Sequence, residues 1–146
     1  MTAGYSGTPL RQKLGIKEGS RVTLLGEPEG FRELLGDLPH GVKVTSIARG
    51  EADVIVLFAT KFSRLKSEFP KAIGLMPPGG GMLWISWPKK AAKMDTDLDE
   101  NLIRDFGLDL GVVDTKVCAI DEKWSGLRFS RRRNANGLKS KTSNTS

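Results

Sequence analysis

The sequence predicts an α/β domain in three layers, with a mostly parallel sheet of about six strands that ends in an antiparallel hairpin. Apolar runs alternate with polar, helix-compatible segments, which is the order of β-α units. One run, residues 53–59, is apolar without alternation, which is typical of a strand covered on both faces. Residues 77–90 form a glycine-rich turn and a buried strand that stops at Pro88 before a basic loop. Together these features favour an open α/β sheet.

The first half of the chain supplies three predicted strands and a short helix. Arg21–Leu25 is a strand ended by Gly26, and Phe31 begins the apolar face of the helix. Residues 42–47 alternate as an edge strand does. Only about six residues join them to the strand at 53–59, whereas a parallel crossover usually needs a dozen or more. A fully extended link in a parallel arrangement is favoured, and an antiparallel edge strand is the alternative.

In the middle of the chain, residues 62–73 carry apolar side chains at helical spacing, and Pro70 predicts that this helix is broken or kinked. Residues 82–87 form the next buried strand. Because this run and residues 53–59 both lack alternation, we expect the two strands to be adjacent and central.

The remaining elements are a helix and a hairpin. Asp95 or Thr96 is expected to cap the helix, which Gly107 ends. Residues 112–120 and 127–131 are strands whose short connection predicts an antiparallel pair.

The positive charge belongs to the end of the chain. The 146 residues carry a formal net charge of +6, but five of the 23 basic residues lie within 131–141, which leaves 18 basic against 17 acidic residues for positions 1–130. We therefore predict one domain over residues 1–131 and a disordered basic tail over 132–146. That tail suggests weak, nonspecific nucleic-acid binding as one function.

Cysteine usage and hydropathy favour a reduced, cytoplasmic setting. Cys118 is the single cysteine, so no internal disulfide forms, and its apolar neighbours indicate a core residue. No apolar run has the length of a membrane span, so no membrane partner is expected. No cluster of His, Cys and acidic residues has metal-ligand spacing, and no metal site is expected.

Two segments resemble class I methyltransferases. Residues 14–26 (LGIKEGSRVTLLG) are similar to the first motif of that fold, and residues 52–58 (ADVIVLF) to its fourth strand. The resemblance implies a shortened Rossmann-like fold and binding of S-adenosylmethionine. In that fold the cofactor requires a glycine-rich turn after the first strand and an acid that ends the second strand.

This sequence departs from both requirements. Glu27, Pro28 and Glu29 occupy the middle of the turn between Gly26 and Gly30, and residues 42–47 contain no acid. The departures predict that S-adenosylmethionine is disfavoured as a ligand.

A second resemblance covers residues 3–130. Four segments, 3–10, 28–31, 87–90 and 116–128, are similar to a family of small bacterial proteins known as domain of unknown function number 3052. This resemblance implies a bacterial protein and brings no activity with it.

The binding site is expected where the carboxyl ends of the parallel strands bring their following loops to one edge. The amino-terminal arm is expected to cover that edge. No catalytic residue is identified, and the candidate binding residues are Tyr5, Ser6, Glu27, Glu29, Thr60, Lys61, Lys89, Lys90, Asp121, Trp124 and Ser125.

The sequence leaves open whether the protein is an enzyme. The favoured interpretation is a non-catalytic protein that binds a small ligand or regulates a protein partner. The alternatives are an S-adenosylmethionine-dependent methyltransferase and a weak nucleic-acid-binding protein.

Overall fold

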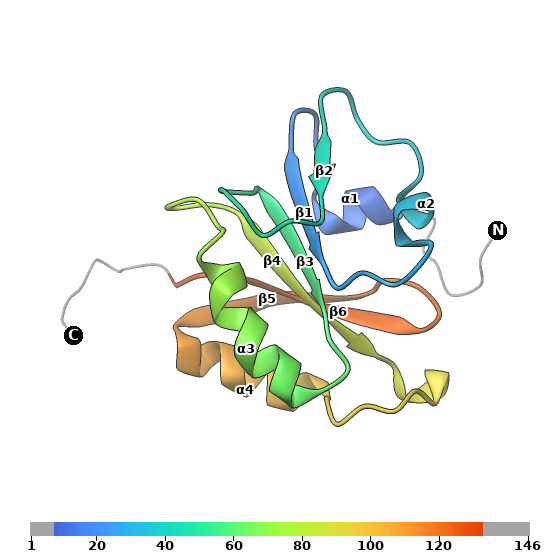
Figure 1. The fold of residues 1–146 in the computed structure, drawn as a ribbon, viewed down its shortest axis with the longest axis vertical. Helices are drawn as coiled ribbons and strands as arrows, with labels where there is room; N and C mark the ends of the chain where they lie inside the picture. The colour runs from blue at the N-terminus through green and yellow to red at the C-terminus, as the bar shows by residue number, and fades with distance from the viewer. Residues whose placement is uncertain (1–7, 133–146) are drawn as a thin grey trace.

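The computed structural model describes residues 8–132, which fold around one six-stranded sheet (Figure 1). The strands are β1 (Arg21–Leu25), β2 (Lys43–Thr45), β3 (Val54–Phe58), β4 (Met82–Pro88), β5 (Val112–Ala119) and β6 (Trp124–Arg131). Their order across the sheet is β2-β1-β3-β4-β6-β5. β1 to β4 are parallel, and β6 and β5 add an antiparallel hairpin. The predicted fold class is confirmed, and the favoured parallel direction of the edge strand is correct.

Helices cover both faces of the sheet. They are α1 (Leu10–Leu14), α2 (Phe31–Leu35), α3 (Phe62–Ile73) and α4 (Glu100–Leu110), with a 3-10 turn at Lys90–Ala92. α1 and α2 pack on one face, and α3 and α4 lie together on the other (Figure 1). None of the helices among residues 8–132 is long and apolar enough to cross a membrane.

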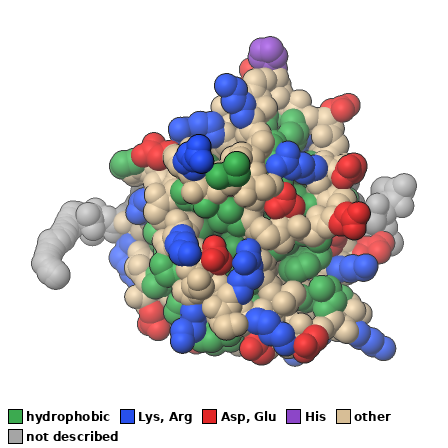
Figure 2. All heavy atoms as spheres, viewed as in Figure 1, with side chains coloured by type: hydrophobic (Ala, Val, Ile, Leu, Met, Phe, Trp, Pro, Cys, Tyr) green, Lys and Arg blue, Asp and Glu red, His purple; other side chains and the backbone are tan. Residues whose placement is uncertain are grey.

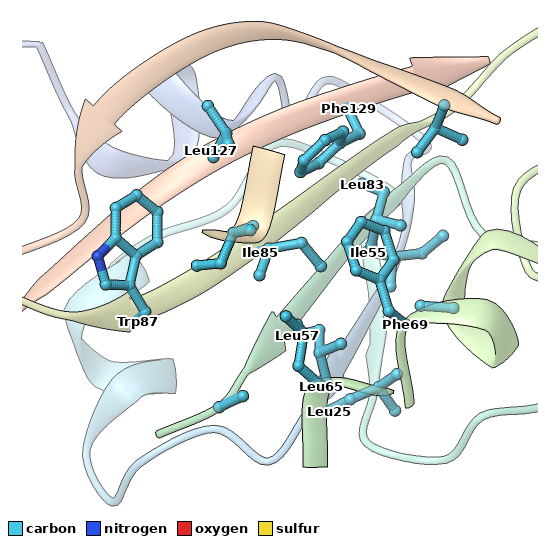
Figure 3. Packing of buried hydrophobic residues seen from close by; sticks show 14 of the residues in the cluster. Leu25, Ile55, Leu57, Leu65, Phe69, Leu83, Ile85, Trp87, Leu127 and Phe129 are labelled. Carbon is cyan, nitrogen blue, oxygen red and sulfur yellow. The ribbon is translucent and has the colours of Figure 1, made fainter. Parts of the chain in front are cut away.

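The larger core lies between the sheet and the α3–α4 layer. Ile55 and Leu57 of β3 and Leu83 of β4 are fully buried there beneath Phe69 of α3 (Figure 3). Every residue of β3 is buried, as the lack of alternation predicts. The two strands predicted to be central are indeed adjacent in the middle of the sheet.

The second core lies beneath α1 and α2. Trp84 of β4 is fully buried there, and its indole N–H donates to the carbonyl of Leu14 over 3.1 Å. Phe58 of β3 makes edge-to-face contacts with Phe31, at 4.8 Å between ring centroids, and with Trp124, at 5.2 Å. These aromatic contacts join α2 and the start of β6 to the end of the central strand.

The start of α4 differs from its prediction. The cap is Asp99, whose side chain accepts from the amide of Leu102 over 2.8 Å, and not Asp95 or Thr96. The residues before it hold the start of α3 instead, because Asp97 accepts from the amide of Phe62 over 2.8 Å. The contact between Asp97 and Phe62 joins segments that are 35 residues apart, so local sequence does not reveal it.

One further boundary differs, and the helix predicted to break or kink at Pro70 is unbroken. α4 runs past Gly107 to Leu110, because this glycine fills a packing role: a side chain there would overlap the ring of Phe129. α3 continues through Pro70, which lies in its last turns. The proline therefore does not end the helix.

Candidate functional site

The carboxyl ends of β1, β3 and β4 meet at one edge of the sheet. β1 has β2 on one side and β3 on the other, so the strand order reverses at β1. In open α/β sheets such a reversal opens a crevice beyond the strand ends, where ligands bind. The turn after β1 and the loop after β3 flank this position.

Glycine is required in the turn after β1. Gly26 has a φ of +71°, and Gly30, which precedes α2, has a φ of +86°. A Cβ atom at Gly26 would lie 3.0 Å from the carbonyl oxygen of Phe58 and 2.6 Å from Nη2 of Arg64. The backbone of this turn therefore approaches the end of β3 more closely than any other residue type allows.

Arg64 spans the ends of β1 and β3. It projects from the first turn of α3, and its Nε donates to the carbonyl of Phe58 over 3.2 Å. Its Nη2 is the atom that crowds Gly26. The guanidinium thus lies where the turn after β1 meets the end of β3, and its fork of donors suits a carboxylate or a phosphate. Arg64 is absent from the residues predicted from sequence.

A carboxylate lies at the end of β2, although β2 itself has none. Ser46 follows β2, and its hydroxyl donates to Oε2 of Glu27. The same hydroxyl accepts from Nη2 of Arg32 over 2.8 Å, and Nε of Arg32 lies 3.8 Å from Glu27. The turn after β1 therefore supplies an acid at the carboxyl end of β2.

A hollow of about 390 Å³ opens beside this turn, and we name it the turn hollow. An adjoining hollow of about 300 Å³ surrounds residues 27–33. Asp121 shapes the far wall, because its Oδ1 accepts from the amides of Lys123 and Trp124 over 2.8 Å each. The turn hollow is lined by Pro28, Glu29, Gly30, Phe31, Leu34, Asp121, Glu122, Lys123 and Trp124. Three of the residues predicted from sequence, Glu29, Asp121 and Trp124, therefore meet in one place.

Another three predicted residues line a different hollow of about 440 Å³, which we name the lysine hollow. Lys89, Lys90 and Ser125 lie there with Trp87 and the start of α4. Trp87 belongs to the core beneath α3 and α4, whereas Trp124 of the turn hollow belongs to the core beneath α1 and α2. The predicted residues are thus divided between the two faces of the sheet, and Lys89 lies in a different hollow from Glu29.

Lys61 and Thr60, two further predicted residues, make contacts between loops. Lys61 pairs with Asp95 at 2.9 Å, and the carbonyl of Thr60 accepts from the hydroxyl of Thr96 over 2.6 Å. Tyr5 and Ser6 lie outside the described residues. Among residues 8–132, no group of three or more His, Cys, Asp or Glu side chains is arranged to hold a metal ion.

No family model matches the chain, and neither does any curated protein. Membership of the domain of unknown function family number 3052 therefore stays a prediction.

Three solved structures with a similar fold are methyltransferases. An S-adenosylmethionine-dependent methyltransferase from Aquifex aeolicus is 18% identical, with a TM-score of 0.54 over 82% of this chain and 86% of that one. Magnesium protoporphyrin IX methyltransferase from Synechocystis PCC 6803, with bound SAH (S-adenosylhomocysteine), is 13% identical, with a TM-score of 0.54 over 79% and 75%. Ribosomal protein L11 methylase from Lactobacillus delbrueckii subsp. bulgaricus is 14% identical, with a TM-score of 0.52 over 85% and 76%.

These similarities correct two expectations. A non-catalytic ligand-binding or regulatory role is contradicted, because the structures that share this fold are methyltransferases and favour that alternative. The prediction that S-adenosylmethionine is disfavoured is likewise not supported, because this cofactor or its product is named with the matching folds. The chain has the Rossmann-like fold of S-adenosylmethionine-dependent methyltransferases.

Proposed function

We propose that the protein binds S-adenosylmethionine at the carboxyl edge of its sheet and transfers the methyl group to an acceptor. The observation that carries this proposal is the position of the tight turn at Gly26. It lies where the strand order reverses, next to a hollow of about 390 Å³. This volume falls within the range of small-ligand sites.

The residues at this edge suit the parts of the cofactor. Gly26 lets the backbone come close, and Glu27, at the end of β2, offers a carboxylate that accepts hydrogen bonds from ribose hydroxyls. Arg64 offers donors to the carboxylate of the methionine moiety. Bound S-adenosylmethionine supplies an electrophilic methyl group on a positively charged sulfur.

The net charge of the turn hollow indicates which class of methyl acceptor it can bind. Glu29, Asp121 and Glu122 line it against the single cation of Lys123, which leaves two net negative charges. Such a site attracts a sulfonium ion and disfavours an anionic acceptor. A carboxylate in the wall also accepts the proton that a hydroxyl or amine acceptor loses. We therefore propose a neutral or amine-bearing acceptor.

Calorimetric titration of the full chain with S-adenosylhomocysteine tests the proposal. We expect saturable binding at one site, and Arg64→Ala should weaken it by about tenfold or more, since a hydrogen bond to a charged group contributes about 1.5–3 kcal/mol. The same variant should leave the affinity for 5′-methylthioadenosine unchanged, because that nucleoside has no carboxylate. Lys66→Ala, which removes another cation of α3, is the matched control and should change neither affinity.

Absence of binding at millimolar S-adenosylhomocysteine would rule out the proposed cofactor. If Arg64→Ala weakens the binding of both ligands equally, the proposed cofactor stands, but Arg64 does not bind its carboxylate. Methyl transfer is then measured as the formation of S-adenosylhomocysteine from S-adenosylmethionine with a panel of small amines and alcohols.

A further inference from the structure

Cations gather on the face of the β5–β6 hairpin that lies on the α1 side of the sheet. Lys116 of β5 and Arg128 of β6 are direct cross-strand partners there. Like charges in such a pair repel, so the pairing of Lys116 with Arg128 does not itself stabilise the sheet. Lys13 of α1 adds a third charge nearby, because the carbonyl of the next residue, Leu14, accepts from the indole of Trp84, over which Arg128 lies.

Within the hairpin, no acidic side chain lies beside Lys116 or Arg128. Asp114, the acidic residue of β5, turns to the other face and accepts from Nε of Arg104 on α4 over 2.9 Å. Among residues 8–132, no ion pair includes Lys116 or Arg128. Burial raises the pKa of the Cys118 thiol, and the charges of Lys13, Lys116 and Arg128 oppose that rise. By contrast, both signs of charge are interspersed over α3 and α4 (Figure 2).

Arg128 is held in a fixed orientation. Its guanidinium lies 5.9 Å from the ring centroid of Trp84, and its Nε donates to the hydroxyl of Thr115 over 2.8 Å. A planar guanidinium fixed in this way suits the oxygens of a phosphate. Trp84 is fully buried beneath it and offers no surface on which a nucleobase could stack.

We propose that the hairpin face formed by Lys13, Lys116 and Arg128 binds the phosphate backbone of a nucleic acid without reading its base sequence. Neighbouring strands place charged side chains about 5 Å apart on this face, which allows adjacent phosphate contacts. A protein partner is less suited, because the centres of protein interfaces are depleted of lysine, whereas nucleic-acid interfaces are rich in positive charge.

One cation at the end of β6 is not part of this surface. Nη2 of Arg131 donates to the carbonyls of Ile73 and Met76, over 3.2 and 2.8 Å, on the opposite side of the sheet. Arg131 therefore anchors the end of α3. The proposed surface is also independent of the proposed cofactor site, since it shares no residue with the turn hollow.

The test is fluorescence anisotropy of the full chain with a short labelled DNA duplex and a labelled single strand of mixed sequence. The variant Lys13→Ser with Lys116→Ser should weaken binding about tenfold at low salt, and should reduce the slope of log affinity against log salt by about two. Lys66→Ser with Lys71→Ser removes the same charge from α3 and should bind as the wild type does. Lys116→Ser alone should unfold at the same temperature as the wild type or a higher one, because repulsion between Lys116 and Arg128 is relieved.

Several results would overturn the proposal. Equal weakening by the two double variants would show that net charge, rather than this face, attracts the nucleic acid. Wild-type binding by the hairpin variant, combined with loss of binding on deletion of residues 133–146, would assign the contact to the end of the chain. Tighter binding to labelled polyglutamate than to DNA would identify an acidic protein as the partner. An unchanged affinity of the hairpin variant for S-adenosylhomocysteine would separate this test from that of the cofactor site.

Discussion

Replacing Gly26 by alanine perturbs the point on which the proposed site depends, and Gly30 provides a matched comparison. Both glycines adopt left-handed backbone angles, with φ of +71° and +86°. A Cβ atom at Gly26 would press on Phe58 and Arg64, whereas one at Gly30 would meet no atom within 4 Å. The two substitutions therefore share the backbone strain and differ in the steric contact.

The structure sets the expected magnitudes. An alanine in the left-handed region costs about 1–2 kcal/mol, and this is the whole expected effect of Gly30→Ala. Gly26→Ala also displaces the guanidinium of Arg64 and weakens its hydrogen bond to Phe58, a loss of about 0.5–1.5 kcal/mol. The entropy that alanine removes from the unfolded chain is the same in both variants and cancels. Gly26→Ala should therefore be about 1 kcal/mol less stable than Gly30→Ala.

Urea unfolding of both variants measures this difference. With a slope of about 2 kcal/mol per molar urea, the two midpoints should differ by about 0.5 M. In an Arg64→Ala background the difference should shrink, because the displaced hydrogen bond is already absent. Equal midpoints in the wild-type background would refute the reasoning, because Arg64 would then not lie over Gly26.

Three further predictions concern stability and reactivity. Gly107→Ala should destabilise the protein, because overlap with the Phe129 ring costs about 1–3 kcal/mol and outweighs the helix preference of alanine, which is about 1 kcal/mol. Phe129→Leu in the same chain should restore the urea midpoint. An increase in stability of Gly107→Ala would contradict the packing. Hydrogen bonds from Arg21 lower the pKa of Asp53, so the folded state binds fewer protons than the unfolded state. The pair therefore stabilises the fold above about pH 4, and this stabilisation is lost as the pH falls further. Asp53→Asn should flatten that part of the unfolding profile, and an unchanged profile would exclude the pair as its cause. Because burial raises the pKa of Cys118, a thiol reagent should react slowly at neutral pH and more slowly still in Lys116→Ser, and rapid reaction at pH 7 would contradict this.

Much of the fold follows from patterns within single segments. The unbroken apolar run at residues 53–59 predicts a central strand because double-sided burial leaves no polar position, and every residue of β3 is buried. The short connection at residues 121–126 likewise predicts the antiparallel hairpin, although its second strand begins earlier than predicted, at Trp124.

Features that depend on contacts between distant segments cannot be predicted from patterns within single segments. Asp97 accepts a hydrogen bond from the amide at the start of α3, which lies 35 residues earlier in the chain. The acidic and hydroxyl residues before α4 therefore suggest the wrong cap for that helix. Gly107 resembles a helix end and is instead required for packing against β6.

The candidate site was harder to predict for the same reason. The acid at the end of β2 comes from Glu27, 19 residues before its partner Ser46, so a search within residues 42–47 finds none. Arg64 reaches the turn after β1 only because α3 packs beside it. Pro28, which seemed to argue against the cofactor, lines the turn hollow.

The most direct test of the account is an amide chemical-shift titration of the labelled chain with S-adenosylhomocysteine. The account predicts saturable shifts at residues 26–33, 58–60 and 121–124, which surround the carboxyl edge of the sheet. The amino-terminal edge serves as the internal control, because a hollow of about 440 Å³ is lined there by Gly19, Asp53 and Gly81. Shifts confined to that edge, or no shifts at millimolar ligand, would contradict the proposed cofactor site.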